Sequence, residues 1–220
     1  MVKLVFLCRR RPDISHARYA ELLLRDHVPI ALRHHPTLRR YVVNIVEESP
    51  PDAPLLDSIG ELWFDTLEDF RQRLYDSPEG ERIVVADVAR FMGGADAYVV
   101  EETVHRVSSP HTPVGTRTPG SKLIVCARRA PACDADAFAA AWTTRRVPDI
   151  LARWPAITAY TTARVRQVLG NVHLPWDTFE AVYGAPGVAP DALRNAVDRG
   201  RPATAERLTA YRVGEHVQRR

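Results

Sequence analysis

The sequence predicts an α+β protein made of two copies of one unit, each with the element order β-α-β-β-α-β. Short alternating runs rich in β-formers are separated by segments in which apolar residues recur at helical spacing. The stretch Leu24–Asn44 recurs as Thr143–Ala163 at a constant offset of 119 residues. A run rich in Pro, Gly, Ser and Thr at 106–120 separates the copies and has the composition of a linker.

The repeat sets the unit that has to fold, so it comes before any assignment of single elements. The repeat extends without a gap from the first predicted strand of each copy to Asn44 in the first copy and Ala163 in the second. The matched pairs are Lys3 with Lys122, Pro12 with Pro131, Pro29 with Pro148, Pro36 with Pro155 and Tyr41 with Tyr160. We therefore predict an N-terminal domain at 1–105, a linker at 106–120 and a C-terminal domain at 121–220.

In the first copy, the spacing predicts a strand, a long helix, two strands, a helical region and a final strand. Ser15 is a plausible N-cap of the long helix, and Pro29 should kink that helix or split it in two. The predicted elements are strands Lys3–Arg9, Arg40–Glu48, Ser58–Phe64 and Ala95–Val104, and helices from Ser15 to His34, from Asp65 or Thr66 to Tyr75, and from Ser77 to Phe91.

The second copy repeats this order in a trimmed form. Its predicted elements are strands Ser121–Arg129, Ala156–Val168, Thr178–Tyr183 and Glu206–Gly214, and helices Asp134–Arg153 and Pro190–Arg199. The order is the ferredoxin-like one, an antiparallel sheet with both helices on one face. The other face must be buried, and the second copy is the obvious cover.

Composition narrows the function classes. The 220 residues carry a net charge of +3 and three cysteines without CxxC spacing, so we expect neither a disulfide framework nor a metal site. No basic stripe interleaved with aromatic residues predicts nucleic-acid binding, and no apolar run is long enough to cross a membrane. The apolar start runs straight into arginines, which argues against a secretory signal, and we expect a cytoplasmic location.

An ordered set of motifs resembles the EthD domain, a family of the dimeric α+β-barrel superfamily. The motifs are Arg9-Arg10, His27-Val28-Pro29, Pro36 with Tyr41 and Asn44, Glu61-Leu62-Trp63-Phe64, Asp65-Thr66-Leu67-Glu68 and Ser77-Pro78-Glu79-Gly80. The resemblance covers about residues 1–105 well, and 121–215 only in outline. It implies two fused ferredoxin-like domains whose antiparallel sheets pack into an α+β barrel, as a pseudo-dimer that could pair further.

The resemblance also implies a small-molecule enzyme. We expect a tailoring enzyme without cofactors that dehydrates, cyclises or isomerises an aromatic or polyketide-like substrate by proton transfer. Two other functions stay open, a cofactor-free monooxygenase and a non-catalytic carrier. Haem ligation through a single histidine is also open, although the EthD-like pattern does not point to it.

His27 is the leading catalytic candidate, because it matches the histidine of the HxP motif and has a pKa near neutrality. The second copy keeps the adjacent Val-Pro but has Arg146 here, so we predict that the kink is structural and the histidine is not needed for folding. The alternative is a histidine that binds carbonyls left exposed by Pro29. We expect the substrate pocket between the sheet and the helices of the N-terminal half.

Four more residues are site candidates. Glu61 is a second catalytic candidate that could orient His27 or take up a proton; the alternative is a solvated carboxylate. Trp63 shares its strand face and could stack on substrate, although a core position is favoured. Asn44 is lost in the second copy, as His27 is, whereas Tyr41 is kept there, so its role as a pocket residue is the weakest.

The two histidines after the long helix, His34 and His35, lie near its negative end. We expect them to be solvated capping residues.

Overall fold

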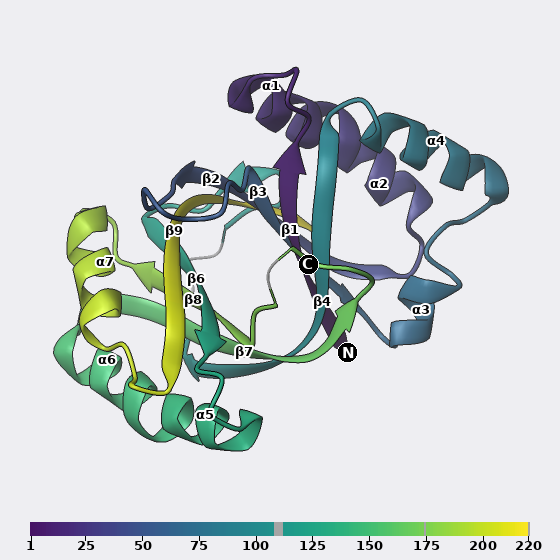
Figure 1. Cartoon of the computed structure of the whole chain (residues 1–220). Coiled ribbons are helices and arrows are strands. Elements are labelled where there is room, and N and C mark those ends of the chain that lie inside the picture. The colour runs from purple at the N-terminus through teal and green to yellow at the C-terminus, as the bar shows by residue number, and fades with distance from the viewer. Residues whose placement is uncertain (108–111, 174, 220) are drawn as a thin grey trace.

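The computed structural model describes residues 1–107, 112–173 and 175–219, and in them the strands form one antiparallel barrel with helices on two sides (Figure 1). The strands are β1 Val2–Arg10, β2 Leu38–Glu48, β3 Ser58–Phe64, β4 Met92–Arg106, β5 Thr116–Arg117, β6 Ser121–Arg129, β7 Ile157–Leu169, β8 Thr178–Gly184 and β9 Ala205–Arg219. The α-helices are α1 His16–Glu21, α2 Val28–His34, α3 Leu67–Arg71, α4 Pro78–Val88, α5 Ala135–Ala141, α6 Val147–Arg153 and α7 Pro190–Arg199. Two π-helical turns, η1 Leu22–His27 and η2 Trp142–Arg146, interrupt the long helices.

The barrel closes edge to edge. The strand order is β2-β3-β1-β4-β7-β8-β6-β9, and β9 pairs back onto β2. The predicted ferredoxin-like order is present in each half, but the two sheets do not simply pack face to face. Backbone hydrogen bonds of β4 with β7 and of β2 with β9 join them into one closed sheet, which removes the exposed edges that invite aggregation.

Strand register makes the repeat visible. Val5 lies opposite Glu61 in the β1–β3 pair, and Ile124 lies opposite Ala181 in the β6–β8 pair. Since Val5 and Ile124 are 119 residues apart, Ala181 is the counterpart of Glu61 in the second half. The division into domains 1–105 and 121–220 stays a proposal, because the halves share one continuous sheet.

The predicted helix starts have identifiable caps. The side chains of Ser15, Thr66, Ser77 and Asp134 each accept a hydrogen bond from a backbone N–H in the first turn of the helix that follows. Thr66 also takes part in a capping box with Asp69. Such caps satisfy donors that the helix itself cannot pair.

Three apolar clusters follow from strand alternation. One fills the barrel, with Val5, Tyr98, Phe179 and Tyr211 among its buried members. The other two lie between the outer face of the barrel and each group of helices. No helix in the described ranges combines the length and apolar character needed to span a bilayer.

Three expectations need correction. The last strand runs to Arg219 rather than Gly214, because its end pairs with β2 of the other half. The predicted linker contains β5, which pairs with β9, whereas its residues 108–111 lie outside the described part of the chain. His34 and His35 are not solvated: His34 binds Asp76, and His35 lies 6% exposed with Nδ1 at 3.2 Å from the carbonyl oxygen of Leu74.

The chain has two lysines, and both point into the barrel. Lys3 is 5% exposed and Lys122 is 3% exposed. The Nζ atom of Lys3 lies 2.6 Å from Glu61, and that of Lys122 lies 2.8 Å from the same carboxylate. Burial alone would lower the pKa of Lys122, but Glu215 and Glu61 raise it by more, to well above its usual value.

Both lysines should resist acylation in the native protein, because their Nζ atoms are buried and bound to carboxylates. We expect brief treatment with an acetylating reagent at neutral pH to leave Lys3 and Lys122 unmodified, and the same treatment in concentrated urea to modify both. Peptide mass spectrometry reads out each site, and the amine of Met1, an 82% exposed residue, is the internal positive control. Rapid native labelling of Lys122 would contradict its place in the barrel.

Candidate functional site

His27 ends a π-helical turn. Helix α1 widens at η1, where the backbone N–H of Val28 donates to the carbonyl of Leu23, five residues earlier. Pro29 lies in the first turn of α2, so the long helix is irregular next to the proline but is not split in two. A π turn accommodates the missing donor of proline within a continuous helix, and such turns are frequent at functional sites. The second half has the same arrangement, with η2 before Pro148.

The imidazole of His27 is held by a buried carboxylate. Its Nδ1 lies 3.1 Å from Oδ2 of Asp87 on α4, and Nη1 of Arg90 donates to the other oxygen of Asp87 at 2.8 Å. The His27 and Phe91 ring centroids are 5.4 Å apart. His27 and Asp87 are 8% and 5% exposed.

This environment favours a neutral, oriented imidazole. Burial lowers the pKa of His27, and the raising effect of Asp87 does not fully offset it. Because an ionised carboxylate only accepts hydrogen bonds, the ring proton is assigned to Nδ1, which leaves Nε2 as a proton acceptor. A carboxylate that fixes the tautomer of a histidine is a recurrent arrangement for general bases.

The expected pairing of Glu61 with His27 is wrong. Glu61 lies on the interior face of β3, whereas His27 lies among the helices outside the barrel. The carboxylate of Glu61 contacts Lys3 and Lys122, and Asn44 donates to it at 2.9 Å. Burial would raise the pKa of Glu61, but Lys122 and Lys3 hold it well below its usual value.

The barrel interior around Glu61 is packed. The cavity there has a volume of about 10 Å³, which is room for one water at most. Trp63 lies beneath two cations, with Lys3 Nζ 4.6 Å and Arg40 Cζ 4.5 Å from its ring centroid. Tyr41 lies on the opposite face of the sheet, buried against the helices of the first half.

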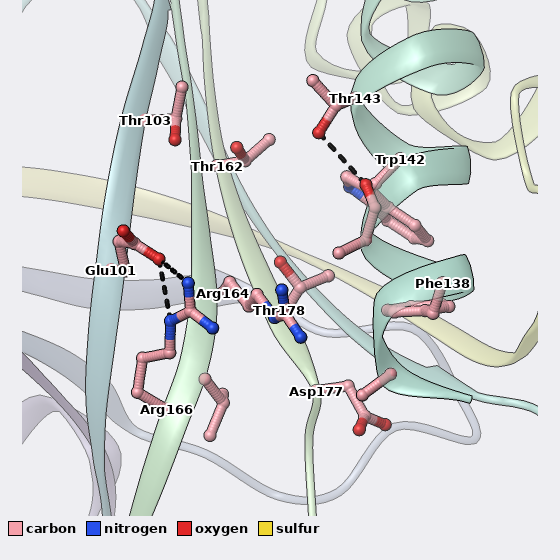
Figure 2. A pocket seen from close by; sticks show the side chains of 13 residues that line it. Glu101, Thr103, Phe138, Trp142, Thr143, Thr162, Arg164, Arg166, Asp177 and Thr178 are labelled. Carbon is pink, nitrogen blue, oxygen red and sulfur yellow. Dashed lines mark hydrogen bonds and ion pairs between the residues drawn. The ribbon is translucent and has the colours of Figure 1, made fainter.

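An open cleft lies beside the helices of the second half, between α5 with η2 and strands β7, β8 and β4, the last of which belongs to the first half (Figure 2). Its volume is about 260 Å³. The pocket was expected in the N-terminal half, at the corresponding place between sheet and helices. Side chains from the strands that line the cleft include Glu101, Thr103, Thr162, Arg164 and Arg166.

His105 was missed as a candidate because it belongs to no sequence motif. Its Nε2 lies 2.8 Å from Oγ1 of Thr162 at the cleft. The signal was strand alternation: Glu101, Thr103 and His105 share one face of β4, which the structure directs toward the second group of helices. In the described residues, no cluster of three or more His, Cys, Asp or Glu side chains forms a metal site.

Comparison with known proteins supports the resemblance for the first half. Residues 11–95 match the family model of the EthD domain, and this range includes both His27 and Asp87. The second half lies outside the match. No curated protein sequence is similar enough to the chain to count as a relative.

Solved structures share the whole fold. An anthrone oxidase-like protein is 12% identical with a TM-score of 0.56, and covers 99% of this chain and 92% of its own. A proposed monooxygenase from Lactobacillus acidophilus is 12% identical with a TM-score of 0.52, over 99% and 96% of the two chains. A mutant chlorite dismutase from Candidatus Nitrospira defluvii is 9% identical with a TM-score of 0.57, over 97% and 90%. At these identities the likeness establishes the barrel fold and leaves the chemistry open.

Proposed function

We propose that the chain is a small-molecule enzyme that works by proton transfer, with His27 as the general base and acid and Asp87 as the residue that orients it. The substrate class is an aromatic or polyketide-like compound, and the reaction is a dehydration, cyclisation or isomerisation. The observation that carries the proposal is the buried His27–Asp87 pair. A neutral imidazole with a fixed tautomer can accept a proton at neutral pH, whereas Arg146 at the repeated position cannot.

Three further observations support this assignment. The EthD match covers the histidine and its carboxylate partner together. The π turn η1 places His27 where the helix is locally widened. One structural neighbour is named for an anthrone oxidase-like activity, which is consistent with an aromatic polyketide substrate.

The test is turnover of a panel of phenolic bicyclic and tricyclic ketones, with products identified by mass spectrometry. His27→Asn should lose roughly 10²–10⁴-fold in kcat/KM, the range that a positioned acid/base contributes. Asparagine can still hydrogen-bond Asp87, so thermal unfolding should change little. The matched control is His34→Ala, which removes a histidine with an aspartate partner, Asp76, outside the proposed site. Activity of His27→Asn near that of the control would rule out the proposed role.

The pH profile gives an independent readout. The acid limb of kcat/KM should lie below the usual pKa of histidine, because burial lowers the pKa of His27. Asp87 raises that pKa, so Asp87→Asn should move the limb to still lower pH. If Asp87→Asn leaves the acid limb of kcat/KM at the same pH, a group other than His27 produces that limb.

A second candidate is cofactor-free oxygenation of an electron-rich phenol. The structural likeness to a proposed monooxygenase and to an anthrone oxidase-like protein favours it. Oxygen uptake during turnover and a product that gains oxygen identify this reaction. If the protein is a non-catalytic carrier, it releases its ligand chemically unchanged. This holds for the wild type, for His27→Asn and for His34→Ala.

A further inference from the structure

We propose that the cleft of the second half binds a small carboxylate that carries a hydroxyl group, at a site separate from His27. Figure 1 shows α1, α2 and α4 on the opposite side of the barrel from α5 and α6, and His27 ends the π turn between α1 and α2. Ligand pockets for drug-sized molecules occupy about 300–1,000 Å³. The cleft, at about 260 Å³, therefore suits a molecule with one ring.

The first observation is that the face of β7 directed at the helices is polar. On β2 the helix-facing residues after Tyr41 include Val43 and Ile45, which are 1% and 8% exposed. The corresponding residues of β7 are Thr162 and Arg164, at the same offset of 119. A strand face directed at helices is normally apolar, so the exchange opens this side of the second half to polar ligands.

The second observation is that the guanidinium group of Arg166 already binds a carboxylate, that of Glu101. Nε of Arg166 lies 2.7 Å from Oε2 of Glu101, and Nη2 of Arg166 contacts the same oxygen (Figure 2). The side chains are 48% and 59% exposed, and an exposed ion pair contributes only about 0–1 kcal/mol. A ligand carboxylate can therefore take the place of Glu101, since the guanidinium fork suits that group.

The formal charges that line the cleft balance, with Arg164 and Arg166 against Glu101 and Asp177. Arg164 lies 2.6 Å from Asp136, whose side chain is 89% exposed. Asp177 also lines the cleft, but its Oδ1 accepts from Nε of Arg129 at 2.9 Å and its Oδ2 accepts from the backbone of Arg129. Its charge is thus already compensated by a residue outside the lining.

Threonine hydroxyls supply acceptors for a ligand hydroxyl. Thr143 donates to the carbonyl of Ala139, and Thr178 donates to that of Ala163, both at 3.1 Å. A hydroxyl whose hydrogen is already used can still accept hydrogen bonds. The cleft therefore combines a cation for a carboxylate with acceptors for an O–H group.

The test is calorimetric titration with 2-hydroxybenzoate, and with 2-hydroxybenzamide as its neutral counterpart. We expect saturable binding of the acid and at least about 10-fold weaker binding of the amide, because a hydrogen bond to a charged group is lost. Arg166→Gln should weaken binding of the acid by a similar factor. Glu101→Gln should strengthen it several-fold, because the competing carboxylate is gone.

Arg153→Gln and Asp149→Asn are the matched controls. They make the same charge changes in an ion pair on α6 that is not part of the cleft lining, and each should leave the affinity nearly unchanged. His27→Asn should also leave it unchanged, which separates this site from the proposed catalytic one. The proposal is overturned by absence of saturable binding, by equal affinity for acid and amide, by equal responses to Glu101→Gln and Asp149→Asn, or by loss of binding in His27→Asn.

Discussion

Lys122→Met is expected to destabilise the barrel by about 3–5 kcal/mol, the usual cost of removing one partner from a buried ion pair. Nζ of Lys122 contacts Asn44 at 2.8 Å, Glu61 at 2.8 Å and Glu215 at 2.6 Å. Methionine ends one atom short of the lysine ammonium group and preserves the packing of the rest of the side chain. Among the described residues, the variant therefore leaves buried Glu215 without a cation at hydrogen-bonding distance, and its remaining side-chain donors are Tyr183 and Thr118.

Urea denaturation measures the loss as a lower midpoint at an unchanged slope. Arg128→Met is the control, because it removes a long cation from the same strand where the side chain is 39% exposed and 3.5 Å from Glu206. Such a surface pair contributes about 1 kcal/mol or less. Equal effects of the two substitutions would mean that the interior charges of the barrel are solvated.

The destabilisation should also depend on pH with a definite sign. Burial would raise the pKa of Glu215, but Lys122 holds it below its usual value, as the lysines do for Glu61. These carboxylates stabilise the wild-type protein above their unfolded pKa, and that contribution is lost as the pH falls through the folded values. In Lys122→Met, acid protonates the unpaired carboxylate, so the difference between variant and wild type should shrink from pH 7 to pH 4.

The bounds of an element were predicted well from the sequence where they depend on residues close by in the chain. Ser58–Phe64 was predicted with the observed bounds, because its alternation and its flanking loops lie within a few residues. The end of β9 was missed, since Glu215 to Arg219 form a strand by pairing with β2, more than 160 residues earlier in the chain. Thr116–Arg117 is similar, because β9 rather than its own composition makes it a strand.

The candidate site was harder to predict for the same reason. The HxP motif identified His27, but nothing near it in sequence reveals that its carboxylate is Asp87 from α4. Glu61 was offered instead because strand alternation shows which residues share a face and not which face points inward. The interior of a closed barrel is expected to be apolar, so its two lysines and their glutamates gave no recognisable pattern.

Arg146→Leu should cost about 3–5 kcal/mol, for the same reason as Lys122→Met but in the helix layer of the second half. The guanidinium is fully buried and binds Glu180 through two parallel hydrogen bonds, Nε to Oε1 and Nη2 to Oε2, both 2.8 Å. Tyr160 and Trp142 also donate to Glu180. The single variant leaves this carboxylate buried without its cation, and chemical denaturation measures the loss.

Arg146→Leu combined with Glu180→Met should recover much of that stability, because both charges are removed together. A residual cost of about 1–3 kcal/mol is expected from the hydroxyl of Tyr160 and the indole N–H of Trp142, which lose their acceptor. A double variant as unstable as Arg146→Leu would show that packing, and not the buried charge, dominates at this position.

The outcome bears on how His27 is understood. By strand register, Glu180 of β8 corresponds to Gly60 of β3, so the second half has exchanged a histidine and a glycine for an arginine and a glutamate. The position is therefore held by a carboxylate in both halves, from α4 in the first and from β8 in the second. Because Arg146 and Glu180 replace the histidine and glycine together, the second copy does not test whether His27 is dispensable for folding, and that stays a prediction. For this reason His27→Asn, which can keep the bond to Asp87, separates proton transfer from stability where alanine would not: equal unfolding midpoints with lost turnover would place His27 in the chemistry.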